Sequence, residues 1–304
     1  MISKGDRIIS ASRRTDIPAF YMEWFMDRVH KGYFEVTNPY NKVSKKIDAS
    51  PSRVHTIVFW SKNYEPFLES GAMNELKQMG YNLFFHFSIN SEAPLLEPEI
   101  PSLAKRLAQL EKLCENNDPG AISWRFDPVC YFKTSSGGIV NNNLSDFSII
   151  AKKASEFGIK RCITSFADNY RKIKRRIQRL NNNGVDAPQL IDISHAKKRK
   201  IIIRMADLLN KNNIELFLCS EKELFYEICA EDRDLYNIKE SACISGPLFE
   251  ELFGGRPLSK RDYGQRTKQG CRCTQSVDIG SYEAHPCYHN CLFCYANPAI
   301  DKEI

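Results

Sequence analysis

Residues 83–89 read Leu83-Phe-Phe-His-Phe-Ser-Ile89 and are apolar at nearly every position. A strand with one wet face would alternate apolar and polar residues, whereas a strand buried on both faces is apolar throughout. The run therefore predicts a buried strand of a parallel sheet. Runs of the same character occupy residues 7–12, 33–37, 56–60, 121–126, 160–165 and 214–220.

Helical stretches separate these runs. Pro18 suits the first turn of one helix, and Gly158 is placed to end another. Leucines recur at helical spacing at positions 103, 107, 110 and 113. Because strands and helices alternate, we expect an α/β fold whose seven units close fully or partly into a TIM-like (β/α) barrel of parallel strands. A doubly wound open sheet is the alternative.

The pattern changes near residue 254. Gly254-Gly-Arg-Pro257 interrupts the helical periodicity, a basic stretch follows, and then the cysteines arrive. We expect a barrel-like domain over residues 1–254. Residues 255–304 are too poor in apolar side chains to fold alone, so they are expected to form an irregular iron–sulfur segment that packs on the barrel.

The composition is that of a soluble protein. Of 304 residues, 42% are hydrophobic and 26% charged, with a net charge of +6. The apolar pair Ile8-Ile9 is too short for the core of a secretory signal, and no run approaches the roughly 18 apolar residues of a membrane span. A cytoplasmic location without a membrane partner is expected. Eleven cysteines in such a protein point to metal or redox chemistry rather than disulfides.

Three of these cysteines have the spacing of an iron–sulfur loop. The segment is Cys287-Tyr-His-Asn-Cys291-Leu-Phe-Cys294. Three thiolates separated by two or three residues can reach three corners of a [4Fe–4S] cluster. No fourth cysteine follows in the loop, so one iron stays open. An open corner is what chelation of S-adenosylmethionine requires.

This spacing, with Phe293 just before the last cysteine, resembles the signature of radical S-adenosylmethionine enzymes, and Tyr295-Ala296 looks like the continuation in spore photoproduct lyase-type members. The resemblance implies a substrate of unknown identity attacked by a 5′-deoxyadenosyl radical, and a reducing partner such as flavodoxin or ferredoxin. In most of those enzymes the loop follows the first barrel strand. Here it lies near residue 300, so their other binding elements cannot be transferred.

The whole chain resembles a narrower group, the bacterial domain-of-unknown-function 1848 family. The resemblance is carried by residues 9–20, 58–63, 124–128 and 219–221, together with the C-terminal cysteines. It strengthens the iron–sulfur interpretation and implies no substrate.

Other metal arrangements remain open. Cys271-x-Cys273 followed by Cys291-x2-Cys294 is close to a zinc-ribbon spacing, and an iron–sulfur electron carrier is a further alternative. A second site is also predicted, because Cys219 and Cys243 end two short apolar runs whose ends would meet at one rim of a barrel. With Cys271 and Cys273 they could hold a second [4Fe–4S] cluster or a zinc ion. The other cysteines are expected in the core: Cys114, Cys130, Cys162 and Cys229.

Polar residues follow the predicted strands, where the active site of a parallel barrel lies. The catalytic candidates are Lys62, Arg125, Asp127 and Asp168. The candidates for cofactor binding are Ser12, Arg13, Arg14, Asp16 and Ser165, with the two arginines suited to an anion. Each residue alone has a structural alternative, such as an Arg13–Asp16 ion pair.

A strongly basic helix is predicted around Ile173, Ile177 and Leu180, with Arg175 and Arg176 among its charges. A solvated outer face is one interpretation. The other is a phosphate-binding surface, which would make the protein a nucleic-acid-binding or repair protein with a structural metal. Aromatic residues do not interleave with these charges, so single-stranded nucleic acid is disfavoured as a substrate.

Overall fold

The computed structural model describes residues 5–38, 41–134 and 137–303. Its centre is a sheet of eight strands in the order β12-β11-β9-β6-β5-β4-β1-β13, and every neighbouring pair is parallel. The strands are β1 (Arg7–Ala11), β4 (Val54–Ser61), β5 (Asn82–Ser88), β6 (Ile122–Val129), β9 (Arg161–Phe166), β11 (Glu215–Leu218), β12 (Ile238–Glu240) and β13 (Val277–Asp278).

The strand order is that of a barrel with one open seam. Seven strands follow one another in chain order from β1 to β12, and β13 returns to pair with β1 on its other side. A doubly wound sheet would reverse its order at an interior strand, so that alternative is wrong. The seam lies between β12 and β13. Since β13 belongs to the segment after residue 254, that segment completes the sheet as well as packing on it, and the division at 254 stays a prediction.

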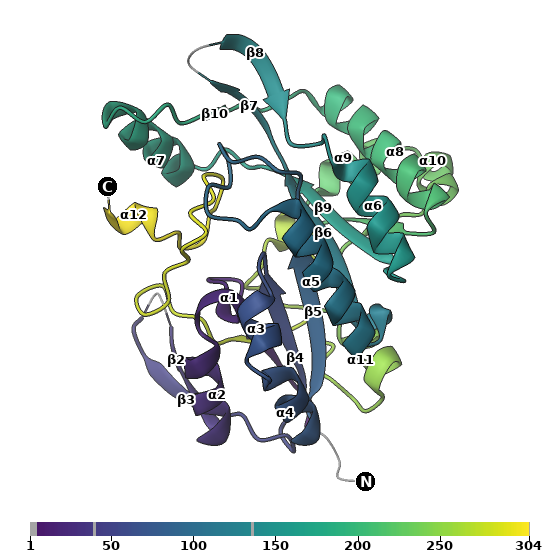
Figure 1. Ribbon diagram of the computed structural model, residues 1–304. Coiled ribbons are helices and arrows are strands. Elements are labelled where there is room, and N and C mark those ends of the chain that lie inside the picture. The colour runs from purple at the N-terminus through teal and green to yellow at the C-terminus, as the bar shows by residue number, and fades with distance from the viewer. Residues whose placement is uncertain (1–4, 39–40, 135–136, 304) are drawn as a thin grey trace.

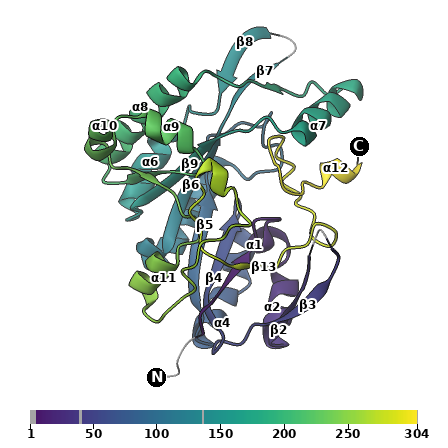
Figure 2. The same cartoon turned by 180° about the vertical axis from the view of Figure 1, so that it is seen from behind.

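Helices cover the outside of the sheet (Figures 1 and 2). They are α2 (Met22–His30), α3 (Glu65–Glu69), α4 (Ala72–Gln78), α5 (Leu103–Asn116), α6 (Phe147–Glu156), α8 (His195–Lys211), α9 (Lys222–Glu227), α10 (Ala230–Leu235) and α11 (Gly246–Phe253). Three others lie toward the C-terminal loops: α1 (Ile17–Phe20), α7 (Arg171–Asn182) and α12 (Ile300–Glu303). Asp16 caps α1 and Ser194 caps α8 through their side-chain oxygens, and Gly158, with φ of 84°, follows α6 as expected.

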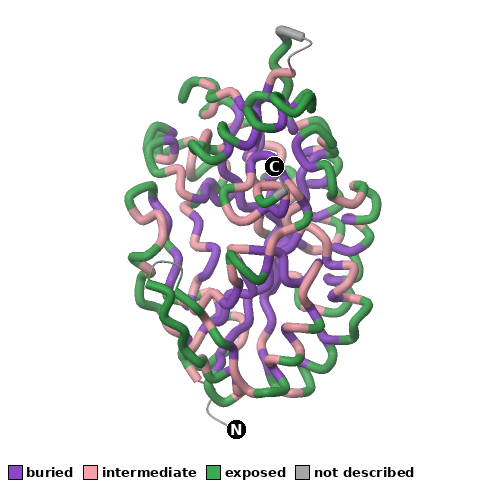
Figure 3. The backbone as a smooth tube through the Cα atoms, turned by 90° about the vertical axis from the view of Figure 1, so that its left-hand side faces the viewer, coloured by how far each residue is buried: buried purple, intermediate pink, exposed green. Residues whose placement is uncertain are grey.

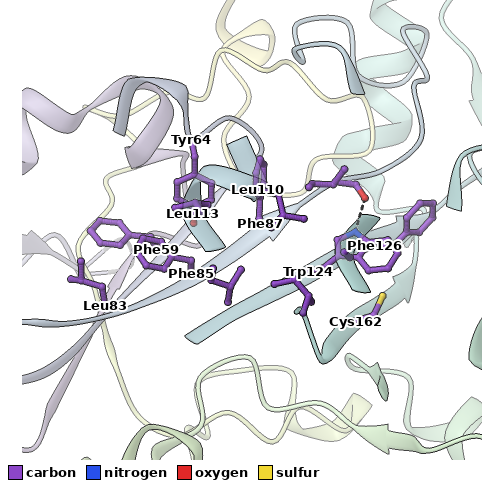
Figure 4. Close-up of a cluster of buried hydrophobic side chains, with 14 of the residues drawn as sticks. Phe59, Tyr64, Leu83, Phe85, Phe87, Leu110, Leu113, Trp124, Phe126 and Cys162 are labelled. Atoms are coloured by element: carbon purple, nitrogen blue, oxygen red, sulfur yellow. Dashed lines mark hydrogen bonds between the residues drawn. The ribbon is translucent and has the colours of Figure 1, made fainter. Parts of the chain in front are cut away.

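Aromatic side chains of β4, β5 and β6 fill the space between the sheet and α5. Figure 4 shows Phe59, Phe85 and Trp124 packed beside Leu110 and Leu113, all of them fully buried. Figure 3 shows the same layering, with buried strands inside and exposed helical faces outside. This burial is why the strand sequences are apolar throughout rather than alternating.

Three strand predictions need correction. The run at 33–37 is β2 (Tyr33–Thr37), but it pairs antiparallel with β3 (Ser44–Asp48) outside the barrel, with its outward residues exposed. β12 and β13 were not predicted, because strands of three and two residues are too short to carry a periodic pattern. A third sheet contains β7 (Tyr131–Thr134), β8 (Gly137–Asn142) and β10 (Gln189–Leu190).

The four cysteines predicted in the core differ in burial. Cys130 and Cys162 are buried and Cys114 is half-buried, whereas Cys229 is exposed. The prediction for Cys229 is wrong because this residue caps α10 at the surface. Among the described residues, no helix combines the length and apolar character needed to cross a membrane.

Replacing Phe85 by alanine is expected to lower the free energy of unfolding by about 3–5 kcal/mol, because it empties the middle of this aromatic layer. Urea unfolding followed by circular dichroism measures the change. Ile149→Ala on the exposed face of α6 is the control, expected to shift stability by less than about 0.5 kcal/mol. Equal effects of the two substitutions would contradict the packing described here.

Candidate functional site

A cavity of about 240 Å³ lies at the carboxyl ends of the strands, whereas the next described cavity measures about 10 Å³. All the residues predicted for catalysis, cofactor binding and metal ligation line this one cavity: Ser12, Arg13, Arg14, Asp16, Lys62, Arg125, Asp127, Ser165, Asp168, Cys219, Cys243, Cys271, Cys273, Cys287, Cys291 and Cys294. The barrel therefore brings together the strand-end polar groups and both groups of cysteines.

The end of β1 is held by Asp278 of β13. The Asp278 carboxylate accepts hydrogen bonds from the Ser12 hydroxyl at 2.6 Å and from the Arg13 main-chain N–H at 2.8 Å. The Arg14 guanidinium lies 3.9 Å from the same carboxylate and donates to the Gly280 carbonyl. Ser12 and Arg14 thus fasten two neighbouring strands together, and Ser12 is buried.

Asp16 joins three parts of the chain. Its Oδ1 accepts from the Ala19 N–H at the start of α1. Its Oδ2 accepts from the Ser61 hydroxyl at 2.9 Å and the Lys62 N–H at 2.8 Å, and lies 2.8 Å from His289 Nε2 in the cysteine loop. Both Asp16 and His289 are buried. The carboxylate therefore positions the loop against β1 and β4. The Arg13–Asp16 ion pair considered from the sequence is not formed.

Lys62 extends toward the cysteine loop. Its Nζ lies 2.6 Å from Glu97 Oε1 and 5.5 Å from the centre of the Phe293 ring. Cys291 Sγ lies 3.7 Å from the same Glu97 oxygen. Burial by itself would lower the pKa of Lys62. The Glu97 charge, the nearby Cys291 and the hydrogen bond to Glu97 together outweigh burial and raise that pKa, so the ammonium group is retained.

Arg125 and Asp127 form an ion pair at the end of β6, and Ser165 of β9 donates to the other Asp127 oxygen. The Arg125 guanidinium also lies 2.9 Å from Cys243 Sγ and 5.3 Å from the centre of the Trp60 ring. These three residues form one continuous polar wall of the cavity.

Asp168 lies at the rim. It pairs with Arg266 at 2.8 Å and accepts a hydrogen bond from the Tyr170 hydroxyl at 2.9 Å. The Arg266 guanidinium lies 5.6 Å from the centre of the Tyr295 ring, directly after the cysteine loop. Since the Asp168 side chain is half-exposed, it contacts both the cavity mouth and solvent.

The cysteine loop is shaped by main-chain bonds. Asn290 adopts a left-handed φ of 52°, a conformation that asparagine tolerates, inside the three-residue spacer. The Cys294 N–H donates to the Cys291 carbonyl, and the Ala296 N–H lies 3.3 Å from Cys294 Sγ. A parallel bridge joins Cys287 to Pro298. All three cysteines of the folded loop line the cavity.

Arg176 of α7 anchors this loop from behind. Its side chain is fully buried, donates to the Leu292 carbonyl at 2.7 Å and forms two bonds of 2.6 and 2.7 Å to Asp301. Figure 1 shows α7 beside the C-terminal segment that carries α12. Arg176 is therefore unavailable to the predicted nucleic-acid surface, whereas Arg175 is exposed.

Burial raises the pKa of Cys291, and burial together with the nearby Asp16 charge raises that of Cys287. In the free protein these thiols hold their protons, which metal binding would displace. Among the described residues, no three His, Cys, Asp or Glu side chains already surround a position for one metal ion.

The other four thiols form a compact group below the loop, against the sheet. Cys219 Sγ and Cys243 Sγ are 3.6 Å apart, and Cys273 Sγ lies 3.4 Å from the Ile244 N–H. Hydrogen bonding from Cys219, aided by Arg125, lowers the pKa of Cys243, and hydrogen bonding from Cys273 lowers the pKa of Cys271 to about 7.

The protein-family model described as Domain of unknown function (DUF1848) matches residues 8–296 of this chain. The chain belongs to the DUF1848 family. No curated protein matches it.

Solved structures similar to this DUF1848 protein are distant. A D-hydantoinase from a Bacillus sp. AR9 and the dihydropyrimidinase from Brevibacillus agri NCHU1002 each share 15% identity, with a TM-score of 0.34 over 62% of this chain and 39% of theirs. Morphinone reductase shares 11% identity, with a TM-score of 0.35 over 84% of this chain and 63% of its own. The chain spans about two fifths of the first two proteins, and at such scores none of them carries an argument about activity.

Three residues that hold the DUF1848 site together were not predicted. Asp278 belongs to a strand too short to recognise, and Arg176 was assigned to an exposed basic run. Glu97 lies in the long connection after β5, where polar residues are common. Six basic residues surround Ile173 and Ile177, and their composition does not distinguish Arg176 from the others. The one available signal is that Arg176 lies three residues after Ile173, which places it beside the apolar stripe of the helix.

Asp16→Asn is expected to lower the free energy of unfolding by about 2 kcal/mol, because an amide cannot accept hydrogen bonds from all four donors. Urea unfolding measures this. Asp168→Asn at the rim is the control and should cost less than about 1 kcal/mol, as exposed ion pairs do. A larger effect at Asp168 than at Asp16 would contradict the assignment of Asp16 as the carboxylate that connects these parts of the chain.

Arg176→Ala is expected to cost about 3 kcal/mol and to loosen residues 287–296, because Asp301 and the loop carbonyls lose their buried partner. The matched control is Arg175→Ala, one residue away and exposed, with an expected change within about 0.5 kcal/mol. Hydrogen exchange of the loop amides distinguishes the two. Unchanged protection in Arg176→Ala would contradict the anchoring role.

Proposed function

We propose that this DUF1848 protein is a radical S-adenosylmethionine-type enzyme. Cys287, Cys291 and Cys294 ligate a [4Fe–4S] cluster, and S-adenosylmethionine binds its open iron. The observation that carries the proposal is the placement of all three thiols on one folded loop that faces the polar cavity at the strand ends. A stability role alone does not account for such a convergence.

The surroundings of the loop suit a cluster with three protein ligands. The Ala296 N–H points to Cys294 Sγ, and such N–H···S bonds stabilise the negative charge of ligating thiolates. Two side chains beside the loop that could bind iron already have partners, since His289 bonds Asp16 and Glu97 pairs with Lys62. The fourth position is thereby left to a ligand from outside the chain.

When bound, the cluster and S-adenosylmethionine would supply a 5′-deoxyadenosyl radical that takes a hydrogen atom from the substrate. The residues of the cavity provide the binding groups. Lys62, a half-buried cation beside the loop that also pairs with Glu97, suits a ligand carboxylate, while Asp127 and Asp168 suit the amino group or a ribose hydroxyl. Tyr295 and Phe293 offer aromatic faces for an adenine ring.

The barrel interior supplies the protection that radical chemistry needs. The strands below the cavity carry fully buried side chains, and residues of the cysteine loop line the cavity as well. A substrate held between them is shielded from water and from side reactions.

The proposed reaction consumes one electron for each cleaved S-adenosylmethionine, so a reducing partner such as flavodoxin or ferredoxin is part of the proposal. Helix α7 packs against the loop through Arg176, and its outer face exposes Lys174, Arg175 and Arg179. This positive face suits an acidic electron carrier. A reducing compartment is required as well, and we propose the cytoplasm.

Anaerobically reconstituted protein is expected to bind about four irons in this cluster and, given dithionite and S-adenosylmethionine, to release 5′-deoxyadenosine. Cys291→Ala should lose both the cluster's iron and the product. Cys229→Ala, an exposed thiol far from the cavity, is the control and should keep both. Iron analysis and chromatography of the nucleoside are the measurements. Product release by Cys291→Ala at the unchanged rate would rule out the proposed cluster.

A further inference from the structure

Four thiols outside the proposed cluster loop gather at the seam of the barrel. Cys219 follows β11, Cys243 follows β12, and Cys271 and Cys273 lie on the segment that leads into β13. All four are buried and belong to one cluster of buried residues. They come from both sides of the gap between β12 and β13, where the sheet has no strand pairing.

Hydrogen bonds and the Arg272–Glu240 ion pair join the two sides of this gap. The Thr274 N–H donates to the Ile244 carbonyl at 2.9 Å, and the Gly246 N–H donates to the Thr274 hydroxyl at 3.1 Å. The Ile244 N–H points to Cys273 Sγ. The last contact is of the kind that main-chain amides make to ligating thiolates. A metal held by all four sulfurs would join the ends of β11 and β12 to the segment entering β13.

Two arginines indicate that an anionic group belongs here. Arg125 lies 2.9 Å from Cys243 Sγ, and Arg13 lies beside Cys273 and Cys243. Arg13 Nη2 is buried and has no hydrogen-bond partner. Asp127 and Asp278 offset part of this positive charge. Four thiolates around a divalent ion carry two negative charges that would balance the rest.

The sulfur spacing suits a common metal. Zinc–sulfur bonds of about 2.3 Å place the sulfurs of a tetrahedral site about 3.8 Å apart. The Cys219–Cys243 distance is 3.6 Å. Since no described set of three donors yet surrounds a single point, the thiols must rotate toward a shared centre as they release their protons.

We propose that Cys219, Cys243, Cys271 and Cys273 bind a metal as a tetrathiolate centre that closes the barrel seam. This centre is separate from the cluster of the proposed function and does not depend on it. Binding replaces four S–H bonds by four metal–sulfur bonds and releases four protons to solvent, without any change of oxidation state when the metal is Zn²⁺. The shared chemistry is tetrathiolate ligation, and either a zinc ion or a second iron–sulfur cluster could fill it.

The test uses a variant that lacks the three cysteine ligands of the cluster in the proposed function. In the full chain carrying Cys287→Ala, Cys291→Ala and Cys294→Ala, metal analysis after anaerobic purification should still find one zinc, or else iron with matching sulfide, per chain. The metal that is found distinguishes the two sources. Adding Cys273→Ala should abolish it, whereas adding Cys162→Ala, a buried thiol elsewhere in the sheet, should not.

A second measurement tests the site without the Cys273→Ala variant, in case that variant does not fold. Metal-free triple variant titrated with Co²⁺ should show the intense sulfur-to-metal absorption of tetrahedral thiolate sites, and Zn²⁺ should displace it at one equivalent and raise the thermal midpoint. A triple variant that retains no metal and gives no such absorption with Co²⁺ overturns the proposal. Equal metal loss in the Cys273→Ala and Cys162→Ala variants overturns it as well.

Discussion

The site depends on one buried carboxylate. Asp16 accepts hydrogen bonds from the start of α1, from the end of β4 and from His289 of the cysteine loop. Buried charge is stable only when its lone pairs are satisfied, and here each partner comes from a different part of the chain. The distant cysteine loop is therefore placed over the first barrel strand by an interaction that also starts the first helix.

This placement explains how a cysteine motif near the end of the chain can serve a cavity formed by earlier strands. In the sheet, β13 returns beside β1, and Asp278 binds the residues that follow β1. Arg176 then fixes the loop from the opposite side through the Leu292 carbonyl and Asp301. The C-terminal segment is thus held by ionic contacts on both sides. These contacts bring its cysteines to the cavity although they lie far from β1 in the sequence.

The cavity contains cationic side chains that would be costly to bury without nearby partners. Arg125 is buried, Arg13 and Lys62 are half-buried, and each lies near a carboxylate or a thiol: Asp127, Cys273 and Glu97 respectively. Trp60 lies beside two of the guanidinium groups, at 5.5 Å from Arg13 and 5.3 Å from Arg125. Cationic side chains around two groups of cysteines favour anionic metal centres, because thiolate ligands need nearby positive charge. The proposed cluster and the proposed tetrathiolate centre share this environment.

The sequence alone determined the parallel barrel strands with continuous apolar runs, the end of α6 at Gly158, and the polar residues that meet at the strand ends, because each is a local pattern. Only the tertiary structure decided that 33–37 lies outside the barrel, that β13 completes the sheet, and that Arg176 turns inward while Arg175 stays in solvent. These outcomes depend on partners far away in the chain. Two-residue strands and buried ion pairs leave no periodic signal in the segments that form them.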